Sequence, residues 1–203
     1  MLDPNAFGYS DLRFSWGDHI CAIFDYPYQQ EAVMGGYVAQ GLRAAQRCVW
    51  VAAGSSGRQF RRLLSDLGGD LPTLEGSGQL LVFSEVDFYL RDGLFDAERV
   101  LDLVRTLADD GQQSGFEAMR VAADTSWLRG RPLDPYLWEE LESRLTQGLR
   151  GLPVVMVCQY DRRQVSGSVV IAAFRTHPIV ILGETVYENQ FYQAPGPTSR
   201  EVV

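Results

Sequence analysis

The chain has 203 residues, the length of one ordinary domain, and 46% of them are hydrophobic, so it can form a core without disulfides. Its 26 acidic and 18 basic residues give a formal net charge of −8, which argues against broad binding to nucleic acids or anionic membranes. All 18 basic residues are arginine, which excludes a Schiff-base lysine and the lysine of a phosphate-binding P-loop.

The elements predicted in chain order alternate between short apolar runs, typical of buried strands, and helical patterns. We expect strands at residues 19–25, 47–53, 80–83, 118–123, 153–159 and 179–182. We expect helices at residues 27–46, 60–67, 95–110, 133–149 and 169–174, and an irregular aromatic segment at 86–93. This order predicts a single α/β domain over residues 16–193, with a mostly parallel sheet between layers of helices. Residues 1–15 are expected to form an N-terminal extension and residues 194–203 a flexible tail.

The N-terminus lacks the basic and apolar regions of a signal peptide, and no apolar run is long enough to span a membrane, so we expect a cytoplasmic protein. Cys21, Cys48 and Cys158 each lie in an apolar run, which predicts buried, reduced thiols. The two histidines, His19 and His177, form no recognisable zinc spacing with them, and we expect no metal or cofactor.

Polar and aromatic residues follow the predicted strands at their carboxyl ends, where open α/β sheets bind ligands. A recognition pocket explains them, and so do ordinary solvent-facing loops. Residues 54–58 (GSSGR) are either an anion site at a helix start or a simple strand-to-helix connector. Asp124 resembles the Mg²⁺-holding aspartate of nucleotide hydrolases, but without a P-loop a capping role is the simpler interpretation.

The sequence contains no recognisable motif for nucleophilic catalysis. There is no G-x-S-x-G elbow, and neither histidine is close in sequence to a serine or cysteine in a recognisable catalytic spacing. A dyad that includes His19 or His177 and forms only in the folded chain remains an alternative.

Five stretches, in matching order from about residue 16 to 192, resemble the MEDS family of sensory domains. They are residues 17–25 (GDHICAIFD), 41–51 (GLRAAQRCVWV), 160–163 (YDRR), 175–178 (RTHP) and 187–192 (YENQFY). The resemblance implies a three-layer fold related to RecA/KaiC-type ATPases that has lost its nucleotide-binding motifs. Where a P-loop would stand, residues 24–31 read FDYPYQQE, with two acids and neither glycine nor lysine, so they would repel a triphosphate.

The resemblance implies a signal-sensing module. Our first hypothesis is a non-catalytic sensory or regulatory domain that binds a small organic ligand or a partner protein and relays the signal to a separate effector. In this hypothesis Asp25, Tyr26 and Glu31 line the former P-loop site, and Arg58 and Arg162 attract an anionic group. Trp127 and Tyr160 offer stacking surface, and Asp124 completes the candidate set.

Two alternatives stay open. One is a ligand-independent interaction module that pairs with itself or with a kinase or anti-sigma partner, through residues 137–149 or 86–95. The other is a nucleotide-binding ATPase relative.

Overall fold

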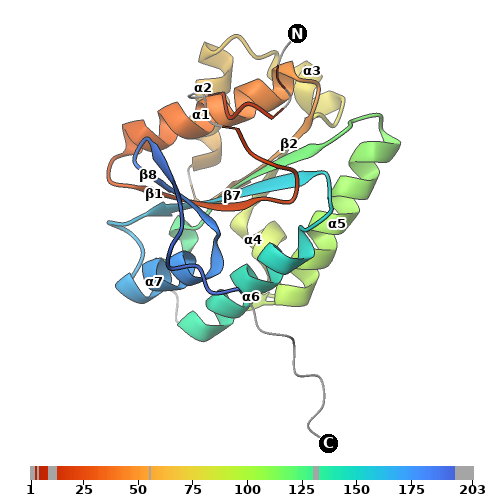
Figure 1. Cartoon of the computed structure of the whole chain (residues 1–203). Helices are drawn as coiled ribbons and strands as arrows, with labels where there is room; N and C mark the ends of the chain where they lie inside the picture. The colour runs from red at the N-terminus through yellow and green to blue at the C-terminus, as the bar shows by residue number, and fades with distance from the viewer. Residues whose placement is uncertain (1–2, 4, 9–12, 55, 130–132, 195–203) are drawn as a thin grey trace, which may run out of the picture.

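The computed structural model describes residues 3, 5–8, 13–54, 56–129 and 133–194 (Figure 1). Its centre is a seven-stranded sheet in the order β3-β2-β6-β7-β1-β8-β9. Every neighbouring pair is parallel except β8 and β9. The strands are β1 (His19–Phe24), β2 (Arg47–Ala52), β3 (Leu80–Ser84), β6 (Met119–Asp124), β7 (Val154–Asp161), β8 (Ile179–Leu182) and β9 (Thr185–Glu188).

Helices cover both faces of the sheet, as Figure 1 shows. One face carries α1 (Pro27–Arg43), α2 (Ser56–Asp66) and α3 (Leu71–Gly76). The other carries α4 (Glu85–Tyr89), α5 (Ala97–Gln113), α6 (Pro135–Gly148) and α7 (Gly167–Thr176). The helix starts have local causes: Asp96, Asp134 and Ser166 accept hydrogen bonds from backbone amides in the first turns of α5, α6 and α7.

Two hydrophobic cores form, one on each face, because successive side chains of a strand point to opposite faces. On β2, Trp50 packs toward α1 and α2, whereas Val49 and Val51 pack toward α5 and α6. Phe7 and Phe14 belong to the α1–α2 core, so the described residues before residue 16 pack onto the domain. We call these two layers the α1–α2 face and the α5–α7 face.

The predicted α/β fold with a mostly parallel sheet is confirmed, with strand ends within two residues of those expected. The short elements were not predicted: α3, α4, β9, the hairpin β4 (Leu90–Arg91) with β5 (Leu94–Phe95), and the 3₁₀ helix η1 (Ser126–Leu128). The five predicted helices begin or end up to four residues from the prediction, because capping interactions determine where the first and last turns stop. Of the expected tail at residues 194–203, all but Ala194 lie outside the described residues.

The prediction of an exposed apolar face on residues 137–149 is wrong. Trp138, Leu141, Leu145 and Leu149 are buried in the core of the α5–α7 face, and only Leu137, at 47% exposure, reaches solvent. A helical repeat of large apolar residues fits a core as well as a docking surface, and here it covers the sheet. Within the described parts of the chain, no helix has both the length and the apolar character that crossing a membrane requires.

Candidate functional site

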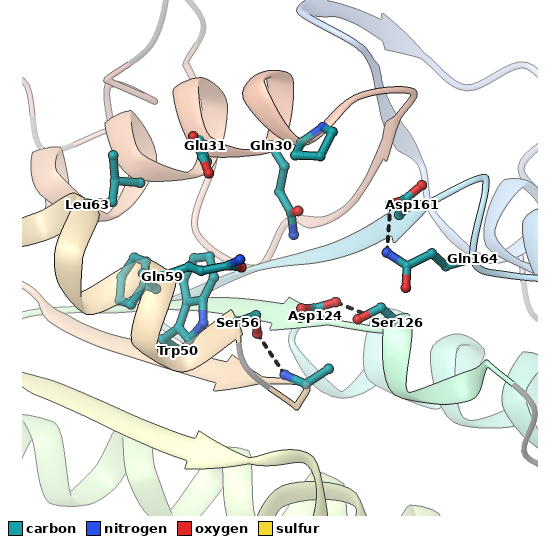
Figure 2. Close-up of a pocket in the computed structure, with 13 residues that line it drawn as sticks. Gln30, Glu31, Trp50, Ser56, Gln59, Leu63, Asp124, Ser126, Asp161 and Gln164 are labelled. Carbon is teal, nitrogen blue, oxygen red and sulfur yellow. Dashed lines mark hydrogen bonds between the residues drawn. The ribbon is translucent and has the colours of Figure 1, made fainter.

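A crevice opens at the carboxyl edge of the sheet because the connections leaving β2 and β6 cross opposite faces. A cavity of about 300 Å³ lies there, between α1, α2 and the ends of β6 and β7, and we call it the edge cavity (Figure 2). Its lining consists of three acids, three glutamines, two serines and five apolar residues: Glu31, Asp124, Asp161, Gln30, Gln59, Gln164, Ser56, Ser126, Pro27, Trp50, Ala53, Phe60 and Leu63.

Two of the predicted site residues, Glu31 and Asp124, line the edge cavity. In Figure 2, Glu31 projects from α1 toward Gln59, and Asp124 lies at the end of β6 below Gln30. The turn from β1 to α1 that the sequence marked as a former P-loop is only two residues long, Asp25 and Tyr26. Such a short turn has no loop with which to surround phosphate groups.

The other residues of that turn and the two arginines are not part of the lining. Arg162 forms an ion pair with Asp25, and both side chains are substantially exposed. Tyr26 is exposed and stacks on Tyr28, with ring centroids 5.5 Å apart. Arg58 lies exposed on α2. The expected pair of anion-attracting arginines therefore does not face the edge cavity.

Trp127 and Tyr160 do not offer stacking surface at the edge cavity, which corrects that expectation. Both are buried, at 7% and 0% exposure, in the core of the α5–α7 face. Trp127 lies in η1, which follows β6, and it stacks on Tyr89 with centroids 4.9 Å apart. Tyr160 belongs to β7, where alternate side chains face opposite layers, and its hydroxyl donates to Glu142 Oε1 at 2.5 Å.

The aromatic surface of the edge cavity comes instead from Trp50 and Phe60. Their rings are nearly parallel, with centroids 3.6 Å apart. The indole Nε1 of Trp50 is buried and has no hydrogen-bond partner among the described residues. A buried donor left unpaired costs about 1–3 kcal/mol, and this nitrogen has almost no surface of its own open to the cavity.

Much of the polar wall near β7 is engaged in hydrogen bonds within the protein, although Gln159 Nε2 has no partner among the described residues. Asp161 accepts hydrogen bonds from the Arg163 guanidinium at 2.7 and 2.9 Å and from Gln164 Nε2 at 2.8 Å (Figure 2). These bonds, those from Arg163 first, lower the pKa of Asp161 to about 2, so it is ionised at neutral pH. On α1, Gln30 Nε2 donates to Gln159 Oε1 at 2.9 Å.

Asp124 is the buried acid of the site, at 4% exposure. Burial raises the pKa of its carboxyl above the usual value of 3.8, against the hydrogen bond that it accepts from the Ser126 amide at 2.9 Å. Because its folded-state pKa is raised, the ionised carboxylate costs stability at neutral pH, and this cost vanishes below the unfolded pKa.

Replacing Asp124 with asparagine is therefore expected to raise the free energy of unfolding at pH 7.5. The gain should shrink as the pH falls through the raised folded-state pKa toward 3.8, where both side chains are neutral. Urea unfolding of both proteins at pH 7.5 and pH 4 measures this. An asparagine variant less stable than wild type at pH 7.5 would mean that the charge strengthens the hydrogen bonds by more than burial costs.

No described residue that lines the edge cavity is basic, whereas three are acidic. The sequence interpretation missed Trp50, Gln59 and Gln164. Every residue of β2 is buried, so its pattern did not reveal which face Trp50 occupies. Gln59 and Gln164 follow the strand ends within the next helix or loop, and only the fold shows that they point inward.

The profile of MEDS, the methanogen/methylotroph, DcmR sensory domain, matches residues 18–178. The transcriptional repressor DcmR of Methylorubrum extorquens is 26% identical over 168 residues. These residues are 82% of this chain and 60% of the repressor, so the chain spans less than two thirds of that relative's length. The crystal structure of a KaiC-like protein from Pyrococcus horikoshii is similar over 84% of this chain and 72% of that one, with a TM-score of 0.57 and 12% identity. That likeness confirms the expected KaiC-like fold.

Proposed function

The chain belongs to the MEDS family of sensory domains, and we propose that it is a non-catalytic sensor that binds a small organic molecule in the edge cavity. The observation that carries this proposal is a cavity of ligand size at the carboxyl edge of the sheet, lined by the aromatic rings of Trp50 and Phe60 and by the acids Glu31 and Asp124. A sensory role follows from the family, whereas the ligand site is our proposal.

The lining defines the class of ligand. Trp50, Phe60 and Leu63 favour an apolar part of the ligand. The carboxylates of Glu31 and Asp124 disfavour anions and favour hydrogen-bond donors or a positive charge. A small uncharged or cationic molecule with an apolar part and hydrogen-bond donors fits this lining.

A nucleoside triphosphate would fit the edge cavity poorly. The two-residue turn between β1 and α1 has no phosphate loop, and Arg162 is held by Asp25 outside the lining. Two carboxylates would stand close to any phosphate placed in the edge cavity. We therefore rank ATP binding well below binding of an uncharged or cationic molecule.

Sensing requires that the ligand bind one conformation of the protein more tightly than another. The edge cavity lies between helices of one face and the loops that end β6 and β7, so a ligand there would bridge separate elements. We propose that occupancy shifts α1 and α2 relative to these loops and that an effector detects the shift. The repressor activity named for DcmR supports a transcriptional output.

Exchange of Gln59 for alanine tests the site. We expect a ligand found by thermal-shift screening of small neutral and cationic organic compounds to bind this variant roughly 3- to 10-fold more weakly, the value of one hydrogen bond. Gln112→Ala, an exposed helical glutamine on α5, is the matched control and should bind normally. Isothermal titration measures both affinities.

Tight binding of Mg·ATP in the same titrations would contradict the proposal, as would ligands whose affinity is unchanged by Gln59→Ala. Light scattering addresses the interaction-module alternative. A stable dimer or a captured partner, formed equally with and without ligand, would favour a module that needs no small molecule.

A further inference from the structure

Four buried side chains converge on the α5–α7 face, away from the edge cavity. They are His19 at the start of β1, Glu142 on α6, Cys158 on β7 and His177 at the end of α7, and none is more than 1% exposed. One nitrogen, sulfur or oxygen atom from each lies within 4.8 Å of all the others. Figure 1 shows α6 and α7 side by side beneath the sheet. The four residues of the cluster come from these two helices and from β1 and β7.

Four of the six distances among these atoms match the edges of a metal-centred tetrahedron, within a set that spans up to 4.8 Å. Bonds of about 2.0–2.3 Å to nitrogen, oxygen and sulfur place neighbouring ligand atoms roughly 3.3–3.7 Å apart. His19 Nε2 lies 3.3 Å from both Cys158 Sγ and Glu142 Oε2. Glu142 Oε2 lies 3.6 Å from Cys158 Sγ and 3.5 Å from His177 Nε2.

Neighbouring groups fix the protons of both imidazoles. His177 Nδ1 lies 2.9 Å from the Ala173 carbonyl oxygen, which only accepts, so this nitrogen carries the proton. His19 Nδ1 lies 2.8 Å from Thr146 Oγ1, whose own proton points to the Thr176 carbonyl at 2.6 Å. Both Nε2 atoms therefore present lone pairs to the centre of the cluster.

The cluster holds one buried nitrogen that no described residue satisfies. Glu142 Oε1 is occupied by the Tyr160 hydroxyl, while Oε2 faces both histidines. His177 Nε2 has no hydrogen-bond partner among the described residues, although it is fully buried. A lone pair left in this way is unfavourable unless a cation receives it.

We propose that His19, Glu142, Cys158 and His177 bind one divalent transition-metal ion, with Zn²⁺ as the best match for two nitrogens, a sulfur and an oxygen. A thiolate and a carboxylate neutralise the two positive charges, so the buried site carries no net charge. Three of the ligands are oriented by hydrogen bonds to groups outside the cluster: His177 to the Ala173 carbonyl, His19 to Thr146 and Glu142 to Tyr160. Ligands of metal sites are commonly oriented in this way.

A closed site with four protein ligands stabilises rather than catalyses. His19 Nε2 and Cys158 Sγ are close enough for the dyad that the sequence left open, but both are buried beneath α6 and α7, where a substrate has no access. The metal would instead tie β1 and β7 to α6 and α7. This inference is independent of ligand binding at the edge cavity.

Cobalt reconstitution tests the site. The reduced chain, stripped with a chelator and titrated with Co²⁺, should bind one ion and show thiolate-to-cobalt charge transfer with the intense visible bands of four-coordination. Cys158→Ala should lose the charge-transfer band. Cys48→Ala removes a buried thiol from the α1–α2 face and should keep it.

Two measurements on the wild-type chain test the metal site even if the Cys158 variant fails to fold. X-ray absorption of the Zn²⁺ form should show one sulfur at about 2.3 Å and nitrogen or oxygen at about 2.0–2.1 Å. Excess Zn²⁺ should raise the Tm of the stripped protein by roughly 10 °C. Zinc without a sulfur ligand, or Co²⁺ uptake no greater than that of Cys158→Ala, would overturn the proposal.

Discussion

Exchange of Arg120 for methionine is expected to lower the free energy of unfolding by about 3–5 kcal/mol, among the largest effects of any single substitution in this chain. Arg120 has no exposed surface. Its guanidinium donates to Gln46 Oε1 at 2.6 Å, to the Tyr37 carbonyl at 2.8 Å and to the Ala6 carbonyl at 3.0 Å. Methionine fills much of the space but leaves these buried acceptors without donors.

Urea unfolding followed by far-UV circular dichroism measures this loss. Arg105→Met is the control, because Arg105 is half exposed on α5 and its ion pair with Asp102 is a surface pair. We expect the control to change stability by no more than about 0.5 kcal/mol. A loss of under about 1 kcal/mol for Arg120→Met would show that the surrounding backbone re-forms its hydrogen bonds without the guanidinium.

Arg120 also shows where prediction from the sequence ends. The apolar run at residues 118–123 predicts a buried strand, and β6 confirms it. The run does not show that its arginine is fully buried, because the partners lie 74, 83 and 114 residues away in sequence. The Arg120 guanidinium also lies over the Phe14 ring, 4.8 Å from its centroid. This contact holds Phe14 against the domain, although residues 1–15 were expected to form an extension.

The candidate site was predictable only in outline. Chain order and strand ends indicate the carboxyl edge of the sheet, since this depends on local patterns alone. Which side chains reach the cavity depends on which face of the sheet each strand residue points to and on how each helix is rotated about its axis. Asp124 and Glu31 point into the cavity, whereas Tyr160 points to the opposite face of the sheet. The cluster of His19, Glu142, Cys158 and His177 could not be predicted from the sequence for the same reason. Its members come from four elements spread over 159 residues, from His19 to His177.

Trp138→Ala is expected to lower the free energy of unfolding by about 3–5 kcal/mol, or the Tm by roughly 8–15 °C. Trp138 is 1% exposed, its ring lies 5.7 Å from that of Tyr89 and 5.9 Å from that of Trp127, and its Nε1 donates to the Tyr160 hydroxyl at 3.3 Å. The substitution therefore leaves a cavity and also removes a donor from the hydroxyl that holds Glu142.

The same substitution separates the two interpretations of the apolar repeat on α6. Tyr136→Ala, at 78% exposure on the same helix, is the matched control and should leave the Tm within about 2 °C of wild type. If the repeat packs the core, Trp138→Ala lowers the Tm at every protein concentration and leaves the mass in light scattering unchanged. A docking surface predicts the reverse, with dissociation of an oligomer and little change in the stability of the monomer. Because Trp138 contacts the aromatic core of the α5–α7 face on several sides, we expect the first result.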